Sequence, residues 1–118
     1  MALSKDAQNL LVEATRLIGI PGRWIQDDLS SWKREGGKHV STYCAYGAVE
    51  HANATVRANG WDKTQVTMAL ERTCHALSRR GLVSFNDTDG RTQDEVKQIF
   101  CETVKRECTE EAPDGSQS

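Results

Sequence analysis

The stretch Ser84–Val96, "SFNDTDGRTQDEV", joins the apolar residues 82–85 to the last helical pattern of the chain. We predict that residues 82–85 form a short, buried extended segment and that the polar residues after it form a turn. Asn and Asp favour turns, and a glycine such as Gly90 permits positive φ. Thr92 and Glu95 have the spacing of a capping box, which indicates the start of a helix. The simplest interpretation of this stretch is therefore structural.

Two functional interpretations of the same stretch compete with this one. A calcium loop of the EF-hand type with Gly90 at its sixth position would place Phe85 first and Val96 twelfth, and neither side chain can ligate a metal. An anion site at the helix start would use Arg91 and free backbone N–H groups. The neighbouring acids oppose a phosphate there; they are Asp87, Asp89, Asp94 and Glu95. The capping turn is the preferred interpretation.

Upstream of this stretch, apolar residues recur at helical spacing. The first predicted helix follows Ser4 and ends near Gly19. A shorter one carries Trp24, Asp28, Leu29 and Trp32 and ends before Gly36-Gly37. A third begins near Ser41 or Thr42 and ends at Asn59-Gly60, and a fourth begins with a capping box of Asp62 and Gln65 and ends at Gly81. With the last helix, these predict a mainly α protein: a compact bundle of four to five helices with one short extended segment before the last helix.

Length and composition indicate one domain. The chain has 118 residues and a formal net charge of −2. We expect residues 1–109 to form a single helical domain and residues 110–118, which are acidic and polar, to form a flexible tail. The weak negative charge argues against nucleic acid as the main partner. The start lacks the features of a signal peptide, and no run of residues is apolar enough to cross a bilayer, so we expect a cytoplasmic protein with no membrane partner.

The cysteines indicate reduced thiols, because a cytoplasmic protein rarely forms disulfides. They are Cys44, Cys74, Cys101 and Cys108, and no pair has CxxC spacing. A zinc site would have to gather ligands from different helices, for instance His39, Cys44, Cys74 and His75. Isolated thiols more often pack as small apolar groups, so we expect no metal and no other cofactor.

A second motif, "YCAYGAV" at residues 43–49, places Cys44 in the first turn of a predicted helix, where the helix dipole stabilises a thiolate. With His39 and either Asn86 or Asp87, Cys44 could complete a hydrolase triad. His39 has no predicted strand to hold it, and the spacing matches no known peptidase motif. Packing of Cys44 at a helix contact is the preferred interpretation, and no catalytic residue is predicted.

The motif "YCAYGAV", followed by "SFNDTDGRTQDEV", resembles an uncharacterised domain family found in actinobacterial and bacteriophage proteins. That family carries an aromatic-Cys-Ala-x-Gly-Ala helix and a later Phe/Trp-Asn-Asp-x-x-Gly-Arg-Thr corner. The two blocks and the tryptophan segment around Trp24 span most of residues 24–100. This chain has Tyr43 where a tryptophan is common, and Gly36-Gly37 where a proline-rich turn is usual. The resemblance implies a shared fold and a phage or mobile-element setting, without implying a reaction.

Together, these features favour a small non-enzymatic binding protein, monomeric or dimeric, that acts by contact with a host protein. Trp24, Trp32 and Trp61 are the candidate interface residues, because tryptophan is enriched in interface hot spots. The corner is expected to pack on the start of the third helix and to bring together Tyr43, Cys44, Gly47, Phe85, Asn86, Asp87 and Arg91. The candidate ligand-binding residues among them are Tyr43, Cys44, Asn86, Asp87 and Arg91. A small-ligand binder of nucleotide type, using Arg91 and helix N-termini, is the alternative, and a Cys44-dependent hydrolase is a third possibility.

Overall fold

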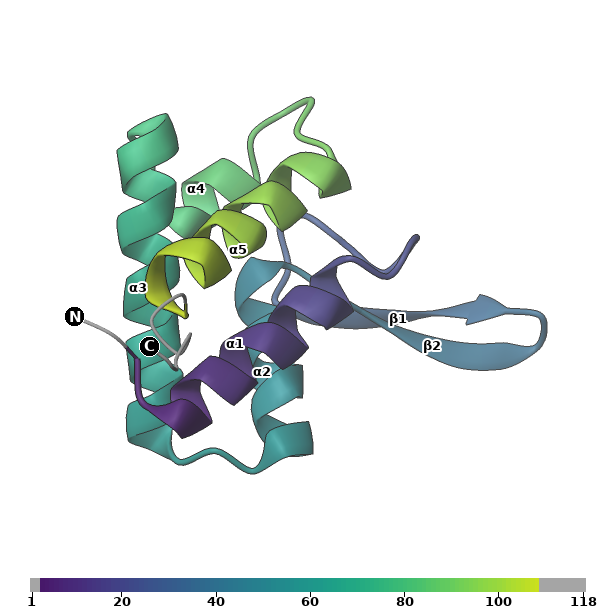
Figure 1. Ribbon diagram of the computed structural model, residues 1–118. Helices are drawn as coiled ribbons and strands as arrows, with labels where there is room; N and C mark the ends of the chain where they lie inside the picture. The colour runs from purple at the N-terminus through teal and green to yellow at the C-terminus, as the bar shows by residue number, and fades with distance from the viewer. Residues whose placement is uncertain (1–2, 109–118) are drawn as a thin grey trace.

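The computed structural model describes residues 3–108, and within them the protein is mainly helical with one small antiparallel sheet. The helices are α1 (Lys5–Ile18), α2 (Ala45–Val56), α3 (Gly60–Ser78), α4 (Leu82–Asn86) and α5 (Gln93–Glu107), and the strands are β1 (Ser30–Glu35) and β2 (Lys38–Tyr43). Figure 1 shows the helices packed together on one side and the two strands extending away from them. The prediction of a mainly α protein is confirmed, and the expected tail at residues 110–118 lies outside the described residues.

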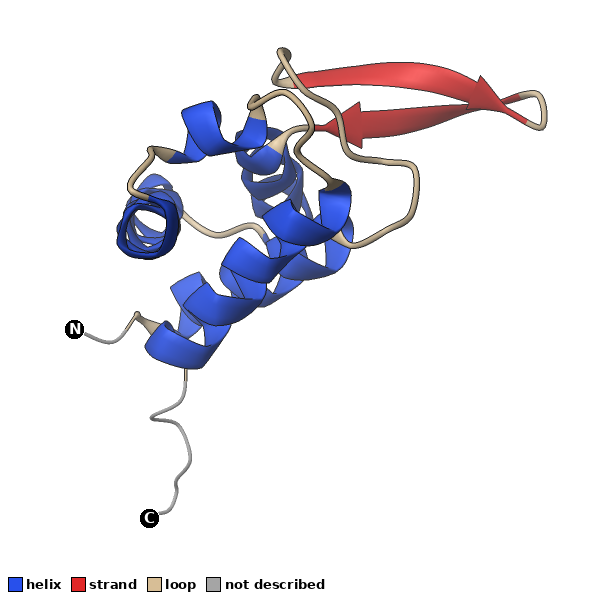
Figure 2. Ribbon diagram, turned by 90° about the horizontal axis from the view of Figure 1, so that it is seen from above, coloured by secondary structure: helices blue, strands red, loops and turns tan. Residues whose placement is uncertain are grey.

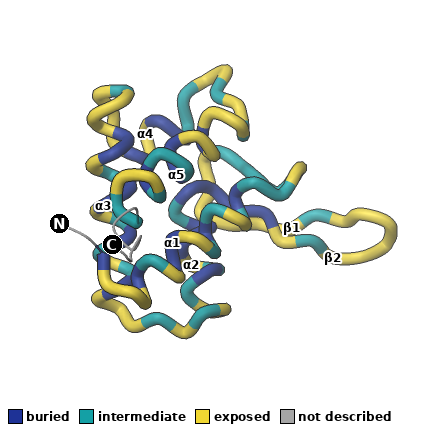
Figure 3. Tube along the Cα trace, in the orientation of Figure 1, coloured by how far each residue is buried: buried dark blue, intermediate teal, exposed yellow. Residues whose placement is uncertain are grey.

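Helix α1 lies at the centre of the core. One face of it is completely buried and consists of Ala7, Leu10, Leu11, Ala14 and Ile18. This face packs against α2, α3 and α5. The Ser4 side chain caps the helix by accepting from the backbone N–H of Ala7, and Gly19 follows its last residue, as predicted. Figure 3 shows the buried segments gathered among the helices, with exposed residues on the outside.

The predicted short helix around Trp24–Trp32 is wrong. Residues 30–43 instead form an antiparallel hairpin, in which Trp32 pairs with Ser41 and Arg34 pairs with His39. Gly36 and Gly37 have φ of 56° and 81°, the left-handed conformation that a two-residue type I′ turn requires at both positions. Leu29 and Trp32, whose spacing suggested a helix, are exposed and do not pack on the core. The third predicted helix consequently begins later, at Ala45.

The prediction of an extended segment before the last helix is also wrong, because residues 82–86 form the short helix α4. Leu82 and Phe85 are buried while Val83 and Ser84 are exposed, which is the pattern of a helix with one face on the core. Gly90 has a φ of 82°, and Thr92 and Glu95 form the predicted capping box of α5. The two helices α4 and α5 are therefore joined by a turn at residues 87–92.

Helix α3 begins earlier than predicted. Its capping box is formed by Asn59 and Asp62, one turn before the predicted pair of Asp62 and Gln65. The backbone of Asn59 is extended and its side chain accepts from the N–H of Asp62 at 2.8 Å. Asp62 is buried and also accepts from the hydroxyl of Ser4, at 3.0 Å, which links the starts of α1 and α3. The other oxygen of the Asp62 carboxylate accepts from the backbone N–H of Asn59 at 3.3 Å, so both carboxylate oxygens favour Asp62 as the third helical residue.

Candidate functional site

Asn86 lies at the centre of the corner that the two sequence motifs predicted. It is buried, and its side-chain oxygen accepts from the indole N–H of Trp24 at 2.8 Å and from the backbone N–H of Ala45 at 3.1 Å. Its amide nitrogen donates to the backbone oxygen of Ile25 at 3.1 Å and to Asp87 Oδ1 at 2.8 Å. We call these five residues, Trp24, Ile25, Ala45, Asn86 and Asp87, the Asn86 corner. All four hydrogen-bonding positions of the amide are used within the protein.

The residues after Ile25 are hydrogen-bonded to the same corner. Asp87 Oδ1 accepts from the backbone N–H of Asp27 at 2.8 Å, and Asp27 has a φ of 64°. The Gln26 amide donates to the backbone oxygens of Asn86 and Thr88, at 3.0 and 2.8 Å. The end of α4 therefore positions the chain between α1 and the hairpin. Gln26 was not predicted, because a glutamine that binds backbone oxygens has no characteristic sequence pattern.

Arg91 is also engaged inside the protein. Its Nε donates to the backbone oxygen of Phe85 at 2.9 Å, and its guanidinium carbon lies 3.7 Å from the centroid of the Phe85 ring. Its Nη1 lies 3.5 Å from a carboxylate oxygen of Glu95. The guanidinium thus spans the turn between α4 and α5.

Cys44 is buried at the N-cap of α2, where its side chain makes no capping hydrogen bond. Its backbone N–H donates to the backbone oxygen of Leu29 at 3.1 Å. That carbonyl also touches Gly47, where an added Cβ would lie only 2.0 Å from the Leu29 oxygen. Glycine at position 47 is therefore required for the chain to enter β1 so close to α2.

Of the other proposed partners of Cys44, His39 lies far from it along the hairpin, while Asn86 and Asp87 are engaged in other contacts. His39 is near the turn of the hairpin, and five residues of extended chain separate it from Cys44 by roughly 16 Å. Asp87 uses Oδ1 to hold Asp27 and Asn86. The hairpin geometry therefore does not bring His39 to Cys44, and no triad with either Asn86 or Asp87 is assembled.

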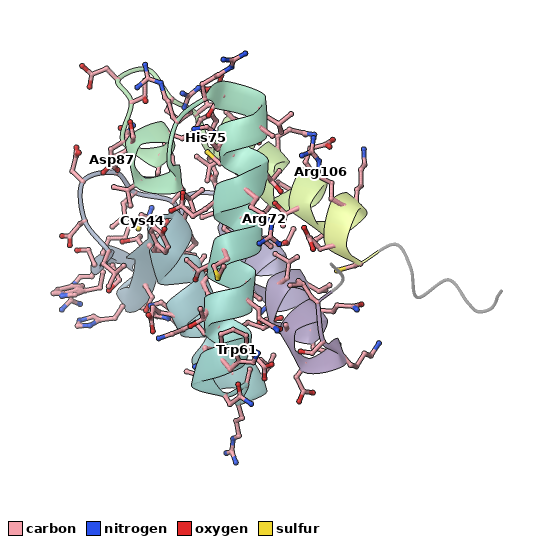
Figure 4. All side chains as sticks on the ribbon, turned by 90° about the vertical axis from the view of Figure 1, so that its left-hand side faces the viewer. Cys44, Trp61, Arg72, His75, Asp87 and Arg106 are labelled. Atoms are coloured by element: carbon pink, nitrogen blue, oxygen red, sulfur yellow. The ribbon has the colours of Figure 1, made fainter. Side chains whose placement is uncertain are left out.

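The structure also bears on the zinc hypothesis. Among residues 3–108, no three His, Cys, Asp or Glu side chains are grouped so that they could hold a metal ion. Cys74 is buried, and burial raises the pKa of its thiol, while its neighbour His75 is exposed. Figure 4 shows His75 on α3 and Cys44 at the start of α2, on different elements. In the same described range, no helix is long and apolar enough to span a bilayer.

A shallow apolar groove lies between α1 and α5. Its volume is about 200 Å³, and it is lined by Val12, Thr15, Cys101 and Val104. The hydroxyl of Thr15 already donates to the backbone oxygen of Leu11 at 2.8 Å. The lining therefore offers little polar chemistry to orient a ligand, and the groove lies away from Cys44.

Glu71 forms a second polar joint that sequence patterns did not reveal. One of its carboxylate oxygens accepts from the phenol of Tyr46 on α2, and the other accepts from the backbone N–H of Leu82, at 2.9 Å, where α4 begins. Burial and the nearby Glu71 carboxylate both raise the pKa of Tyr46. A single side chain of α3 thus connects the helices that bear the two sequence motifs.

The hairpin is the most exposed element of the described protein. We call residues 30–43 the hairpin arm; Figure 2 shows it reaching beyond the helices, and in Figure 3 its outer half is mostly exposed. Trp32 is 59% exposed, and its ring stacks on that of His39 with centroids 4.2 Å apart and 10° between the planes. The two-residue Gly36-Gly37 loop between residues of strand character is the sequence signal that could have revealed the arm.

The three tryptophans occupy different environments. Trp24 is half-buried, packs on the core and binds Asn86, so it belongs to the Asn86 corner. Trp61 is 64% exposed near the start of α3, visible at the foot of that helix in Figure 4. Trp32 and Trp61 are therefore the two available for contact with another molecule, and they lie on separate elements.

The comparison with known proteins supports membership of an uncharacterised domain family. No curated protein and no solved structure matches the chain. A family model described as a family of unknown function, DUF6197, matches residues 3–106, a span that contains every element described above except the last residue of α5. The chain therefore belongs to the family DUF6197.

Proposed function

We propose that this protein is a small non-enzymatic binding protein that acts by contact with a host macromolecule, with the hairpin arm as the contact element. The single observation that carries this proposal is the exposure of the arm. An isolated two-stranded hairpin is only marginally stable in water. In this protein the outer part of the hairpin has solvent on both faces. Its largest side chain, Trp32, is exposed and is not part of the core.

The polar sites of the helical body support the same proposal. The Asn86 amide uses all its hydrogen bonds internally, and Arg91 is held by Phe85 and Glu95. The contacts of Asn86 and Asp87 form a joint that orients the arm, because they hold residues 24–27, two residues before β1 begins. A nucleotide-type site at Arg91 and a hydrolase at Cys44 receive no comparable support. The phage or mobile-element setting implied by the resemblance makes a host protein the partner expected from sequence.

A photo-crosslinking experiment tests which surface makes the contact. A photoreactive amino acid replaces Ser41, which is exposed and pairs with Trp32 in the hairpin. A matched protein carries it at Thr64, which is exposed on α3. In host cells, we expect crosslinked products from position 41 that disappear when Trp32→Ala is added. Equal products from both positions, or products only from position 64, would contradict the proposal.

A further inference from the structure

Strand β1 has an outer edge whose backbone groups point away from the hairpin. In an antiparallel pair, alternate residues direct their N–H and C=O groups to opposite sides of the strand. Tyr43 fixes this alternation, because its N–H donates to the backbone oxygen of Arg23 and its oxygen accepts from the N–H of Ile25, on the outer side of β2. Tyr43 pairs with Ser30. The backbone groups of Ser30 therefore point outward from β1.

The same orientation recurs along β1 at Trp32 and Arg34. Among residues 3–108, no backbone hydrogen bond reaches the outer groups of these two residues or of Ser30. The pairing with β2 is continuous up to Glu35, and β1 contains neither the proline nor the bulge with which proteins commonly protect a sheet edge. The outer edge of β2, by contrast, is already covered at Tyr43. The edge of β1 is open to a further strand.

An extended polypeptide is the chemical complement of this edge, because its own N–H and C=O groups match those of β1. A second copy of β1 supplies such a strand. With a twofold axis at Trp32, the two Trp32 residues face each other and each Ser30 faces the Arg34 of the other copy, so every outward residue lies in a hydrogen-bonded pair. An axis at Lys33 sets two lysines directly opposite each other. An axis at Ser31 pairs Arg34 with a residue that precedes β1.

The side chains fit the axis at Trp32. The ring of Trp32 is exposed and stacks on His39 of its own arm. Pairing across the axis brings the two Trp32 rings together on the same face, and aromatic cross-strand pairs stabilise a sheet. In this register Lys33 faces Ser31 and Glu35 faces Leu29, so no like charges lie directly opposite each other.

The charges of the arm are also self-complementary. We call residues 33–38 the tip of the arm and residues 27–30 its root. At the tip, Arg34 and Lys38 have no acidic side chain within ion-pair distance among the described residues; at the root, Asp27 and Asp28 are exposed and likewise have no basic partner there. Antiparallel pairing sets Arg34 opposite Ser30 of the other copy, two residues after Asp28. Each basic tip thus meets an acidic root.

We infer that two copies of this protein associate through β1 and form one four-stranded antiparallel sheet. Each helical body lies at the root of its own arm (Figures 1 and 2), so the two bodies lie at opposite ends of that sheet. The pairing leaves the outer edge of β2, where Ser41 lies, available to another molecule. The dimer therefore does not depend on the proposed host contact. Because so short a strand interface is smaller than a standard one, we expect micromolar or weaker affinity.

Sedimentation equilibrium of the purified chain, from micromolar to millimolar concentration with a reducing agent, measures the association. We expect a reversible dimer. Arg34→Pro removes an outward N–H that makes no bond within the hairpin, and proline is tolerated on edge strands. Arg34→Ala loses the same charge and keeps the N–H. By symmetry the proline removes two bonds, so Arg34→Pro should weaken the dimer about thirtyfold more than Arg34→Ala. Circular dichroism checks that both variants remain folded.

A charge exchange tests the contact between tip and root. Arg34→Glu and Asp28→Arg should each weaken the dimer about tenfold, because each creates two like-charge contacts by symmetry. The double variant restores opposite charges and should recover most of the affinity. A double variant weaker than either single one would overturn the antiparallel pairing at Trp32.

Amide hydrogen exchange measured by NMR locates the interface. The N–H groups of Trp32 and Arg34 should exchange more slowly as concentration rises, while those of His39 and Ser41 on the outer edge of β2 should not change. A monomer at millimolar concentration, equal dimers for Arg34→Pro and Arg34→Ala, or protection of β2 alone would overturn the inference. Protection of β1 that appears only with host-cell extract would indicate a host strand, so that the dimer fails and the proposed function stands. A dimer without host crosslinks at position 41 would give the opposite result.

Discussion

The side-chain oxygen of Asn86 accepts a hydrogen bond from the backbone N–H of Ala45, 41 residues away, at 3.1 Å. This bond joins the last residue of α4 to the first residue of α2. Since Asn86 also binds Trp24 and Ile25, one amide fixes both helices and the segment leading to the arm. The corner is therefore an internal joint and part of the fold.

Gly47→Ala should be strongly destabilising. The added methyl group would lie 2.0 Å from the backbone oxygen of Leu29 and 2.7 Å from Tyr43 Cβ, so the root of the arm must move away from α2. We expect a loss of about 3 kcal/mol in the free energy of unfolding, the upper range for overpacking. Urea unfolding measures it.

Gly60→Ala is the matched control. Gly60 is the first residue of α3, and an added Cβ there meets nothing within 4 Å. Because alanine restricts the unfolded chain and favours helix, we expect no loss and a gain of up to about 1 kcal/mol. Equal costs at the two positions would contradict the close approach of Leu29 to α2.

The stability of the protein should fall in alkaline solution, in part because of Tyr46. Burial and Glu71 raise the pKa of this phenol above the ordinary value of 10.0. An unfolded chain therefore loses the proton more easily than the folded protein, so the stabilisation is complete below pH 10 and is lost as the pH rises further. Burial also raises the pKa of Tyr43, which adds to the effect.

Comparison with Tyr46→Phe isolates this contribution. The variant lacks the phenol, so its unfolding free energy should decline less steeply than that of the wild type between pH 9 and pH 11. Urea unfolding across this range, with a reducing agent present, supplies the measurement. Parallel decline of the two proteins would show that the bond between Tyr46 and Glu71 does not keep the phenol protonated.

Thr92→Ala should cost about 1 kcal/mol, the usual effect of losing an N-cap. The Thr92 hydroxyl accepts from the backbone N–H of Glu95 at 3.2 Å, and the Glu95 carboxylate accepts from the backbone N–H of Thr92 at 2.9 Å. Thr92→Ser keeps the hydroxyl and should retain most of the stability. Thermal unfolding of the three proteins tests the cap, and an unchanged Thr92→Ala would show that α5 begins independently of it.

Sequence patterns correctly predict the features of the fold that depend on contacts between residues close together in the chain. The buried face of α1, its Ser4 cap, the turn at Gly90 and the capping box of Thr92 and Glu95 all follow from periodicity or short-range hydrogen bonding. The apolar residues Leu82, Val83 and Phe85 fit either an extended segment or one face of a helix, so their pattern does not identify α4. Its first N–H is satisfied by Glu71, eleven residues earlier, which no local pattern shows.

The hairpin arm shows a different limit of sequence analysis. Trp24, Leu29 and Trp32 have helical spacing, but a stripe becomes a buried helix face only when the fold offers it a core. Here Trp24 contacts Asn86 while Leu29 and Trp32 face solvent. Asn86 lies against the start of α2 as expected, yet the contacts of Asn86 and Asp87 with residues 24–27 come from tertiary structure alone.

Urea unfolding of Asn86→Ala beside Trp32→Ala tests most directly whether the Asn86 corner is structural and the hairpin arm is exposed. Asn86→Ala leaves the N–H of Ala45, the indole N–H of Trp24 and the oxygen of Ile25 without partners, and should cost at least about 3 kcal/mol. Trp32→Ala removes only a cross-strand stack and should cost less than about 1 kcal/mol. A stable Asn86→Ala protein, or equal losses in both variants, would contradict the account.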